Sequence, residues 1–518
     1  MNHAQVVALR VRERMQAVER RNWNVRFFLQ DMLFDAPVML GAPLLYNLRT
    51  GPREVEHAMD SRVVGTLVPR ARSGEDAMKV RAKQQIRLAA IAAVAAIGAI
   101  GAGPAAAGGL LLYEFGTAEV GLAAAGYAAR AQDASTAFTN PAGMTRLSGT
   151  QLLAGGQIMW LNQKFSIGGD TSPGLGGNDG GRALGWGGFV PGGGTFVTHS
   201  LSRDVAVGFS VAGNFGSIID YDDAWVGRYR VQQATLLGVQ FVPSIAWRVN
   251  DKLSIGAGLN AVYGIFDQTV AINNAVPNTP DGRLELDDKT WGFGGNVGLL
   301  YDVTPATRVG LTWTSQIELD FRSPTRFSGL GPGLSALLAS RGLLDAQLDL
   351  GVKMPQQVMA SVASRVDDRW TVLGNVGWQQ WSKFGESEIG IDNTQNPTSL
   401  TTSIPFNDTW HVAVGAQYRL SDPWTLNMGI AYDSGFQERG NITTLLPANA
   451  AWRFGVGGEQ QLSKSARWGV AGELLFGGTL DIDKRSTLPP VLGGRGDLVG
   501  SFDNTTSVIV SVYGNWTF

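Results

Sequence analysis

The sequence contains no cysteine, and charged residues make up only 17% of its 518 residues. That charged content is below the roughly 25% typical of soluble domains. The missing thiols fit export through an oxidising compartment, although cytosolic proteins can also lack cysteine. The formal net charge of −2 leaves no basic excess that would indicate a nucleic-acid partner.

A strongly apolar overall composition is also missing, because the mean hydropathy is close to zero. This value excludes a helical membrane bundle, but it allows a β-barrel, whose strands are apolar on one face only. Glycine and tryptophan are abundant instead, with 68 and 15 residues.

The only long apolar run covers residues 88–107. Basic residues precede it, and the small residues 104–107 end it. A basic region, an apolar core and an A-x-A end predict a secretory signal peptide over residues 78–107, with mature protein starting near Gly108. The alternative is a weakly hydrophobic transmembrane helix.

This signal lies far from the N-terminus of the sequence. We predict that Met78 is the true start and that residues 1–77 are an upstream extension absent from the mature protein. The alternative is that residues 1–77 form a cytoplasmic domain, and the apolar patch at residues 33–45 is consistent with that interpretation.

From Gly149 onward the sequence alternates with period two, as in Val205, Val207 and Phe209 against Ala206 and Gly208. This is the pattern of strands with one apolar face. About fourteen such segments follow, each near the ten or so residues that a tilted membrane-spanning strand needs. We place them at 150–165, 186–200, 203–218, 227–248, 252–271, 284–302, 306–321, 347–365, 369–385, 407–420, 423–438, 449–463, 466–481 and 503–518.

Short connections, such as Asn250-Asp251 and Asp367-Asp368, alternate with long ones. The long connections are 166–185, 272–283, 322–346, 386–406 and 482–502. Short periplasmic turns and long external loops are typical of outer-membrane barrels. Because lipid cannot satisfy backbone hydrogen bonds, the strands over 149–518 must close into an antiparallel transmembrane barrel.

Aromatic residues near strand ends are expected to form the interface girdles of that barrel. The candidates are Trp160, Trp247, Trp313, Trp370, Trp381, Trp424 and Trp516. The terminal Phe518, with Trp516 two residues earlier, resembles the signal that the barrel-assembly machinery reads. The sequence therefore predicts an all-β protein of a Gram-negative outer membrane, in contact with lipid and lipopolysaccharide, and we expect a monomer.

The segment 108–148 does not alternate, and Gly116, Gly121 and Gly126 are interleaved with alanine. Such a composition predicts an N-terminal hatch packed inside the lumen. The alternative is a short periplasmic helix.

At this point the chain resembles the FadL/TodX (OmpP1) family of outer-membrane transporters of long-chain fatty acids and aromatic hydrocarbons. Residues 133–135 and 140–144 of this chain look like the hatch of that family. Further motifs of the family occur in order at 225–229, 291–294, 298–301, 378–384, 408–410, 414–415 and 432–434. The resemblance covers 108–518 and implies a fourteen-stranded barrel with a hatch, matching the independent strand count. The implied function is uptake of hydrophobic small molecules by loop capture, hatch gating and lateral exit through a kinked third strand.

The resemblance also implies site residues. The hatch positions are Asn140, Pro141 and Ala142, and the lateral opening corresponds to Asn214, Phe215 and Gly216. For the opening, the alternative is an ordinary strand end. Substrate contacts are expected from Leu334, Leu337, Leu338, Phe138, Lys383 and Arg228.

Two of these expectations have particular reasons. The loop 322–346 carries an apolar cluster that would capture substrate, unless it forms a helix packed on its own barrel. Fatty-acid members are expected to hold the carboxylate with basic residues, yet the corresponding stretches 263–274 and 393–410 contain no Lys or Arg. Either the ligand is neutral or the basic residues have moved, with Lys383 and Arg228 as substitutes.

The sequence offers little chemistry for catalysis. After processing only His199 and His411 remain, so we expect no metal site, no cofactor and no enzyme. Two other functions stay open. A lipid hydrolase would need a Ser–His pair built on one of these histidines. A general diffusion porin would need an open charged lumen, which the hatch-like segment opposes.

Overall fold

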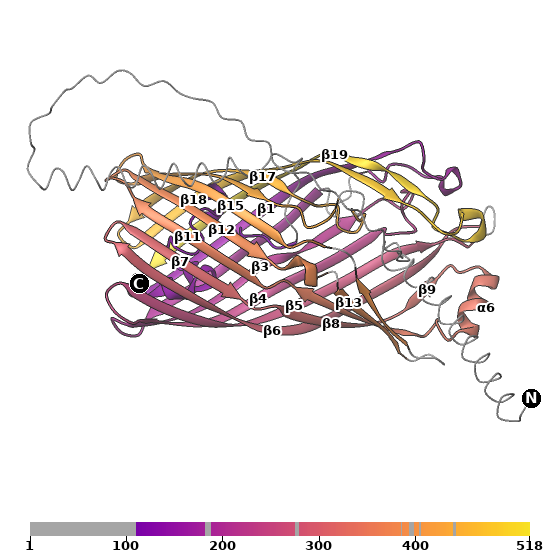
Figure 1. Cartoon of the computed structure of the whole chain (residues 1–518), viewed down its shortest axis with the longest axis horizontal. Helices are drawn as coiled ribbons and strands as arrows, with labels where there is room; N and C mark the ends of the chain where they lie inside the picture. Colours follow the sequence, from indigo (N-terminus) through magenta and orange to yellow (C-terminus); the bar gives the residue numbers. More distant parts are fainter. Residues whose placement is uncertain are drawn as a thin grey trace, which may run out of the picture. The chain divides into compact units, whose positions relative to one another are not determined.

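Fourteen strands follow one another around a closed antiparallel ring, because β5 pairs with β6 as well as with β4. The wall strands are β1 (Thr150–Ile167), β2 (Phe189–Ser200), β3 (Val205–Asp220), β4 (Gln233–Arg248), β5 (Leu253–Ile272), β6 (Gly282–Thr304), β7 (Thr307–Thr314), β11 (Gln357–Arg365), β12 (Trp370–Gln379), β15 (Thr409–Arg419), β16 (Trp424–Asp433), β17 (Ala451–Ser463), β18 (Ala466–Lys484) and β19 (Leu498–Thr517). The predicted fold class and strand number are confirmed, and Figure 1 shows the strands tilted around the ring.

The computed structural model describes residues 110–181, 188–274, 279–384, 386–392, 398–403, 406–438 and 442–518. All of them belong to one of two compact units of the chain, and only that unit is described below. The expected signal peptide at 78–107 and the expected extension at 1–77 lie outside the described residues. Within the described part, no helix has the length and apolar character needed to cross a bilayer.

Four short strands form a second sheet, in the order β14-β13-β10-β8. They are β8 (Ile317–Pro324), β10 (Gln347–Met354), β13 (Glu386–Asp392) and β14 (Thr398–Ser403). This corrects the prediction that 386–406 is a loop. The long strands predicted at 306–321 and 347–365 also break in two, at Ser315-Gln316 and Pro355-Gln356. The second break lies at Pro355, which cannot donate to the ladder.

The remaining elements are short. Strand β9 (Arg326–Ser328) pairs with the outer end of β6. The helices are α3 (Glu119–Leu122), α4 (Thr136–Thr139), η1 (Pro141–Arg146), η2 (Pro173–Leu175), α6 (Pro332–Ser340), η3 (Trp381–Lys383) and η4 (Pro490–Leu492). The predicted strand at 227–248 starts later, at Gln233, because residues 222–231 form turns.

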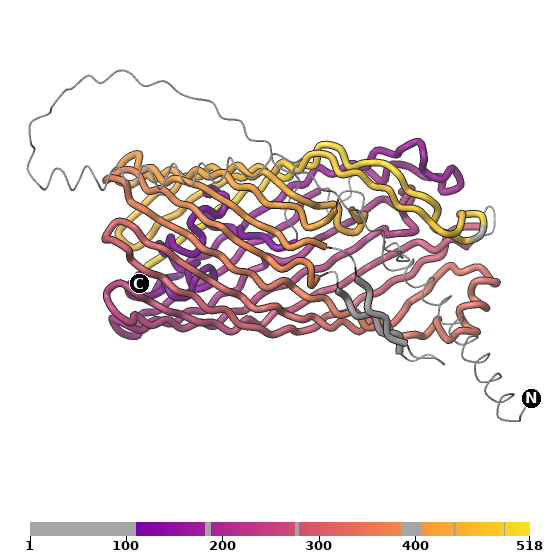
Figure 2. Tube along the Cα trace, viewed as in Figure 1, coloured from indigo at the N-terminus to yellow at the C-terminus, as the bar shows by residue number. Residues whose placement is uncertain are grey.

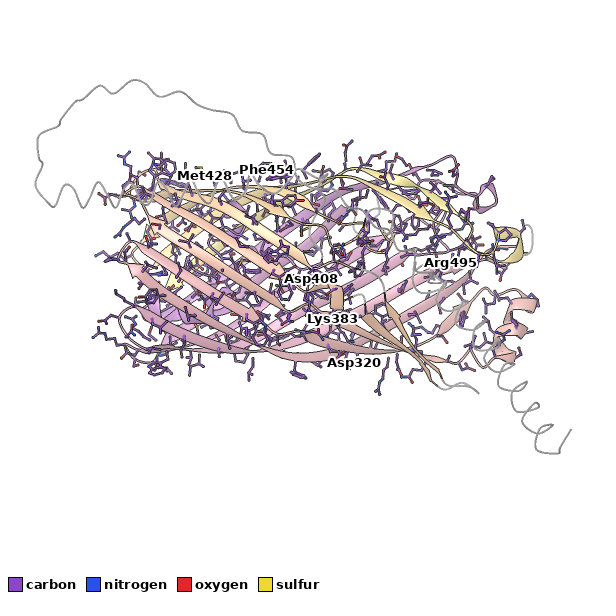
Figure 3. All side chains as sticks on the ribbon, viewed as in Figure 1. Asp320, Lys383, Asp408, Met428, Phe454 and Arg495 are labelled. Carbon is purple, nitrogen blue, oxygen red and sulfur yellow. The ribbon has the colours of Figure 1, made fainter. Side chains whose placement is uncertain are left out.

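Side chains on the outer face of the wall are apolar and exposed, as a lipid-facing surface requires. Examples are Leu259, Phe293 and Val456, and Figure 3 labels two more, Met428 and Phe454. Five of the proposed girdle tryptophans are exposed, namely Trp247, Trp313, Trp370, Trp424 and Trp516. Trp381 is a correction, because it is fully buried against Phe384 and Phe436 rather than facing lipid.

The interior contains the segment 110–148, which runs inside the ring near the end where the short turns and the C-terminus lie (Figure 2). Its helix α3 contacts β15 to β19, while α4 and η1 contact β2 to β6. Because this segment touches strands on opposite sides of the ring, it is the predicted hatch and not a separate periplasmic helix. The other half of the interior, toward the long loops, is filled by large apolar side chains.

Candidate functional site

Glycines on the inner wall let the hatch approach the strands closely. At eight of them an added Cβ would meet hatch atoms at less than van der Waals distance. We call this set the glycine socket: Gly155, Gly208, Gly256, Gly298, Gly310, Gly415, Gly429 and Gly455. At Gly429, for example, a Cβ would overlap the backbone carbonyl of Leu122. The many glycines therefore serve a close fit between hatch and wall.

The three predicted hatch residues lie at this contact. The Asn140 side chain donates to the carbonyl of Ala128 at 2.6 Å and to that of Leu299 in β6 at 3.1 Å. Its Oδ1 accepts from the amide of Ala142 and so caps the helix η1, which begins at Pro141. Asn140 thus links two hatch segments to the wall.

Buried ion pairs fasten the hatch to the opposite side of the wall. The guanidinium of Arg453 in β17 lies 2.5 Å from Glu114 of the hatch, 3.2 Å from Asp433 and 2.8 Å from Glu473. Asp433 also accepts a 2.5 Å contact from His411. We call these five residues the Arg453 cluster. Removing one partner of a deeply buried ion pair strongly destabilises the folded protein, because the other charge is left buried without compensation. The cluster therefore holds Glu114 in place.

Strand β3 is irregular where the resemblance implied a lateral opening. Its pairing with β4 shifts register between Gly213 and Phe215, which leaves Asn214 as a bulge. Among the described residues, β2 pairs with β3 only as far as Gly213. The upper part of β3 therefore continues without β2 beside it.

The first described residues of the hatch occupy that vacated edge of β3. Leu111 forms an isolated bridge with Phe215. The amide of Leu112 donates to the Asn214 carbonyl at 2.7 Å, and the amide of Gly216 donates to the Leu110 carbonyl at 2.8 Å. Within the described part of the chain, the three predicted opening residues thus lie where β3 pairs with residues 110–112 and no longer with β2.

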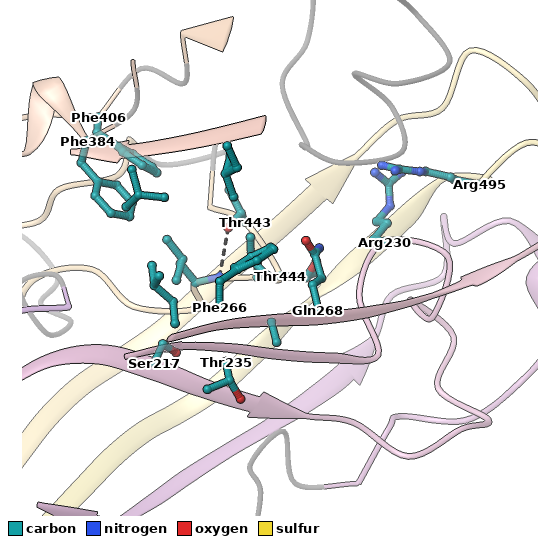
Figure 4. Close-up of a pocket in the computed structure, with 16 residues that line it drawn as sticks. Ser217, Arg230, Thr235, Phe266, Gln268, Phe384, Phe406, Thr443, Thr444 and Arg495 are labelled. Atoms are coloured by element: carbon teal, nitrogen blue, oxygen red, sulfur yellow. Dashed lines mark hydrogen bonds between the residues drawn. The ribbon is translucent and has the colours of Figure 1, made fainter. Parts of the chain in front are cut away.

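Above the hatch lies a pocket that encloses about 950 Å³, including space open to solvent. We call it the extracellular pocket, and Figure 4 shows its lining. In that view Arg230 and Arg495 lie together, away from Phe384 and Phe406. The other lining residues are Ser217, Ala234, Thr235, Leu236, Phe266, Gln268, Leu350, Val352, Thr443, Thr444, Leu445 and Leu446. The pocket is therefore mostly apolar, with a cationic end.

The loop between β16 and β17 supplies part of this lining. Its described residues, 434–438 and 442–450, fold into the lumen, and we call these two stretches together the inward loop. The carbonyl of Thr444 accepts from Tyr221 at 3.1 Å, and that of Pro447 accepts from Gln163 of β1 at 2.7 Å. The inward loop thus contacts β1, three strands away from β17 in the ring, and the connection that follows β3.

Arg228, a predicted substrate contact, fastens loops to one another. Its Nε lies 2.7 Å from Asp281, and its guanidinium donates to the carbonyl of Leu175. The Tyr229 hydroxyl donates to Asp281 at 2.6 Å, and burial together with this bond raises the pKa of Tyr229 to about 12. The phenol therefore stays neutral and keeps donating near neutral pH. Neither Arg228 nor Lys383 lines the pocket.

The other predicted contacts are dispersed. In α6, Leu338 is buried in the extracellular core, Leu334 packs against that core, and Leu337 is 47% exposed. Phe138 lies in the hatch, with ring centroids 5.0 Å from Phe115 and 6.2 Å from Phe196. Sequence reasoning missed Arg230 and Arg495, although Arg230 directly follows the motif at 225–229.

The two histidines do not form a shared site. His199 bonds to Thr150 at the exposed short-turn end, while His411 belongs to the buried Arg453 cluster. In the described part of the chain, no three His, Cys, Asp or Glu side chains are arranged to hold a metal ion.

Residues 98–513 match the profile of the family described as "Outer membrane protein transport protein (OMPP1/FadL/TodX)". The chain belongs to this family. Two curated members illustrate the similarity. Outer membrane protein P1 of Haemophilus influenzae is 27% identical over 372 residues, covering 64% of this chain and 78% of that protein. The long-chain fatty acid transport protein of Escherichia coli K12 is 26% identical over 361 residues, covering 63% and 78%.

Solved structures of OMPP1/FadL/TodX proteins share the fold. A Pseudomonas aeruginosa FadL homologue superposes with a TM-score of 0.67 at 22% identity, covering 79% of this chain and all of that one. The Ralstonia pickettii toluene transporter TbuX gives a TM-score of 0.53 at 19% identity, covering 79% and 99%.

Membership in the OMPP1/FadL/TodX family settles three predictions. The chain is a transport protein of the Gram-negative outer membrane, the family recognised from its motifs is the right one, and the protein is not an enzyme.

Proposed function

We propose that this protein takes up long-chain fatty acids, which bind in the extracellular pocket with the carboxylate between Arg230 and Arg495. The pocket's composition carries the proposal, because apolar walls suit a hydrocarbon chain and two guanidinium groups suit an anion. A carboxylate buried without such donors would be costly. The E. coli relative named a long-chain fatty acid transport protein supports the same assignment.

The two arginines are held in place by the outer loops. Arg230 Nη2 donates to the carbonyls of Lys484 and Gly496, both at 3.0 Å, and Gly496 directly follows Arg495. Arg230 comes from the turn before β4, and Arg495 from the connection between β18 and β19. These basic residues therefore replace the ones missing from stretches 263–274 and 393–410.

Capture begins, in this proposal, at helix α6. Leu337 presents an exposed apolar side chain to the outside, while Leu334 and Leu338 connect it to the core beside the pocket. A substrate bound at Leu337 would reach the pocket along apolar surface.

From the pocket, the substrate leaves sideways through the wall, because the hatch is packed tightly into the glycine socket below the pocket. Transfer from lipid to water costs about 0.8 kcal/mol for each methylene, so a ten-carbon chain favours lipid by roughly 8 kcal/mol. We propose that hatch residues 110–112 act as the gate, leaving β3 so that substrate passes Asn214, Phe215 and Gly216 into the bilayer. Phe138 and Lys383 do not line the extracellular pocket, so the proposed route does not depend on them.

The test compares binding of hexadecanoic acid and hexadecanol to the full-length barrel purified in detergent. Arg230→Gln combined with Arg495→Gln should weaken binding of the acid at least tenfold, because hydrogen bonds to charged groups contribute about 1.5–3 kcal/mol. Binding of the alcohol should stay unchanged. Arg283→Gln removes a similar but half-exposed cation paired with Asp223, and serves as the control.

Aromatic hydrocarbons are the second candidate substrate. Phe266, Phe384 and Phe406 line the pocket, and the last two stack with centroids 5.7 Å apart. The relative named a toluene transporter gives the precedent. Toluene binding without any preference for acid over alcohol would favour this candidate.

We also propose that the protein works as a monomer in contact with lipopolysaccharide and that Phe518 is read by the barrel-assembly machinery. The backbone of Phe518 pairs with Thr150 at the seam between β19 and β1, and its side chain is 77% exposed. A ring that closes on itself leaves no wall strand in need of a second copy.

A further inference from the structure

We propose that the inward loop determines which hydrophobic molecules the extracellular pocket accepts, through the side chain of Leu446, and that Gln437 positions this loop. The inference rests on the proposed function, because it concerns the same pocket. It adds a specificity-determining residue that neither the family motifs nor the predicted site residues include.

The buried side-chain amide of Gln437 holds several parts of the inward loop together. The Gln437 Nε2 donates to the carbonyls of Leu446 at 2.7 Å and Ala448 at 2.6 Å. Its Oε1 accepts from the amide of Thr443 at 2.9 Å. Gln437 is only 4% exposed, so these bonds are made away from water and any lost partner would leave a buried polar group unsatisfied.

The segment 443–446 is further closed on itself. The amide of Leu446 donates to the hydroxyl of Thr443 at 3.0 Å, the bond drawn in Figure 4. The backbone of this segment is also fastened to the connection between β3 and β4, because the Tyr221 hydroxyl donates to the Thr444 carbonyl. Leu446 is therefore presented to the pocket by a preformed turn and not by an irregular connection.

The two faces of the inward loop pack against different parts of the interior. Leu446 lies in the same apolar cluster as the pocket residues Phe266, Phe384 and Phe406. Ile442, only four residues earlier, is buried in the other cluster, with Tyr221 and Trp225. Leu446 lines the pocket and Ile442 does not, so of these two residues only Leu446 is placed to meet a bound substrate.

The pocket lining around Leu446 is expected to select substrates by the width of their hydrocarbon chain. Leu446 shares the lining with phenylalanine rings, so a straight alkyl chain fits where a methyl-branched chain would overlap a side chain. One methylene in an apolar pocket changes discrimination by about tenfold or more. The wild-type protein should therefore prefer hexadecanoic acid to its 3,7,11,15-tetramethyl derivative, which carries the same carboxylate.

The experiment measures the dissociation constants of these two acids for the full-length barrel in detergent. Leu446→Ala should reduce the preference for the straight acid about tenfold, and Leu446→Phe should increase it. Gln437→Glu, which replaces the donating amide group by an acceptor facing two carbonyls, should reduce the preference without altering any pocket side chain. Ile442→Ala is the matched control on the opposite face, and its preference should equal that of the wild type.

Each outcome bears on the proposal. An unchanged preference in Leu446→Ala, or an equal change in Ile442→Ala, would overturn it while leaving the proposed function intact. Wild-type protein that binds neither acid would overturn the proposed function and this inference together. If Leu446→Ala fails to fold, as judged by loss of the gel-mobility difference between heated and unheated samples, Leu446→Val replaces it. The same direction of change is expected for Leu446→Val.

Discussion

The two halves of the barrel interior are packed by different means. The periplasmic half combines close contacts between wall glycines and the hatch with an aromatic cluster that includes Phe115, Phe138 and Phe196, and it is fastened by the Arg453 cluster. The extracellular half is filled by large apolar side chains and contains the pocket. Backbone contacts and buried ion pairs tolerate little displacement, whereas side chains around a cavity can repack. The lower half is suited to act as a fixed floor and the upper half to accept a ligand.

The largest effect on stability is expected when a side chain is added at the glycine socket, where the hatch meets the wall. Gly155 and Gly156 are neighbours on β1, but a Cβ at Gly155 would overlap the Gly116 carbonyl, while one at Gly156 would meet nothing within 4 Å. Gly155→Val should therefore destabilise the barrel by about 3 kcal/mol or prevent hatch docking. Thermal unfolding followed by gel mobility measures this, with Gly156→Val as the control. Equal stability of the two variants would show that the socket is not tight.

The next effect concerns the ion pairs of the floor. Arg453→Met removes the cation that Glu114, Asp433 and Glu473 share, so it should cost about 3–5 kcal/mol. Permeation of a small polar solute through reconstituted protein should rise as the hatch loosens. Arg203→Gln removes an 80% exposed arginine paired with Asp251 and should leave both stability and permeation near wild type. A tight, stable Arg453→Met barrel would contradict the assigned role of the cluster.

A third change tests the exit and should affect uptake more than stability. Gly216 is unsuitable, because its φ of +140° and the nearby Leu236 carbonyl leave no room for a side chain. Gly213, at the same break, has nothing within 4 Å of an added Cβ. Gly213→Trp should slow uptake of hexadecanoic acid several-fold without lowering the unfolding temperature, since the new side chain lies beside the opening. Uptake at the wild-type rate would argue against exit at this place.

The smallest effect is expected at the outer end of the pathway. Leu337→Ser changes a half-exposed residue of α6, so it should lower uptake about two-fold at limiting substrate, with little effect on stability. Leu338→Ser introduces a hydroxyl into the buried core and should mainly destabilise the loop. Identical uptake and stability in the two variants would remove the reason for placing capture on α6.

Much of the fold was predictable, because successive residues of a barrel strand face lipid and lumen in turn, and this alternation is visible in the sequence. Alternation of apolar and small residues located all fourteen wall strands, including β3 from Val205 and Val207. The hatch was predictable from its lack of alternation. The strand breaks were not, because β8 and β10 keep the same alternation as the wall strands that they follow or precede, and only Pro355 hints at a break.

The site was less predictable than the fold. Asn140 and residues 214–216 could be named from the sequence because each belongs to a continuous stretch that resembles the family, and their roles stay predictions. Arg230 and Arg495 are 265 positions apart, and no local pattern shows that two loops bring them into one pocket. The inward loop was overlooked for a similar reason, since its shape depends on the side chain of Gln437 and on contacts with Gln163 and Tyr221.

The central claim is that substrate leaves sideways over a floor that stays in place. Photo-crosslinking tests it directly, using hexadecanoic acid with a diazirine at the end of its chain, bound to the full-length barrel in a lipid bilayer. The account predicts labelled peptides from the pocket and from the β3 break around Phe215 and Leu236, with the hatch between Gly116 and Arg146 unlabelled. Labelling of Ala128, Asn140 or their neighbours in the hatch would contradict it, because the substrate would then pass through the floor.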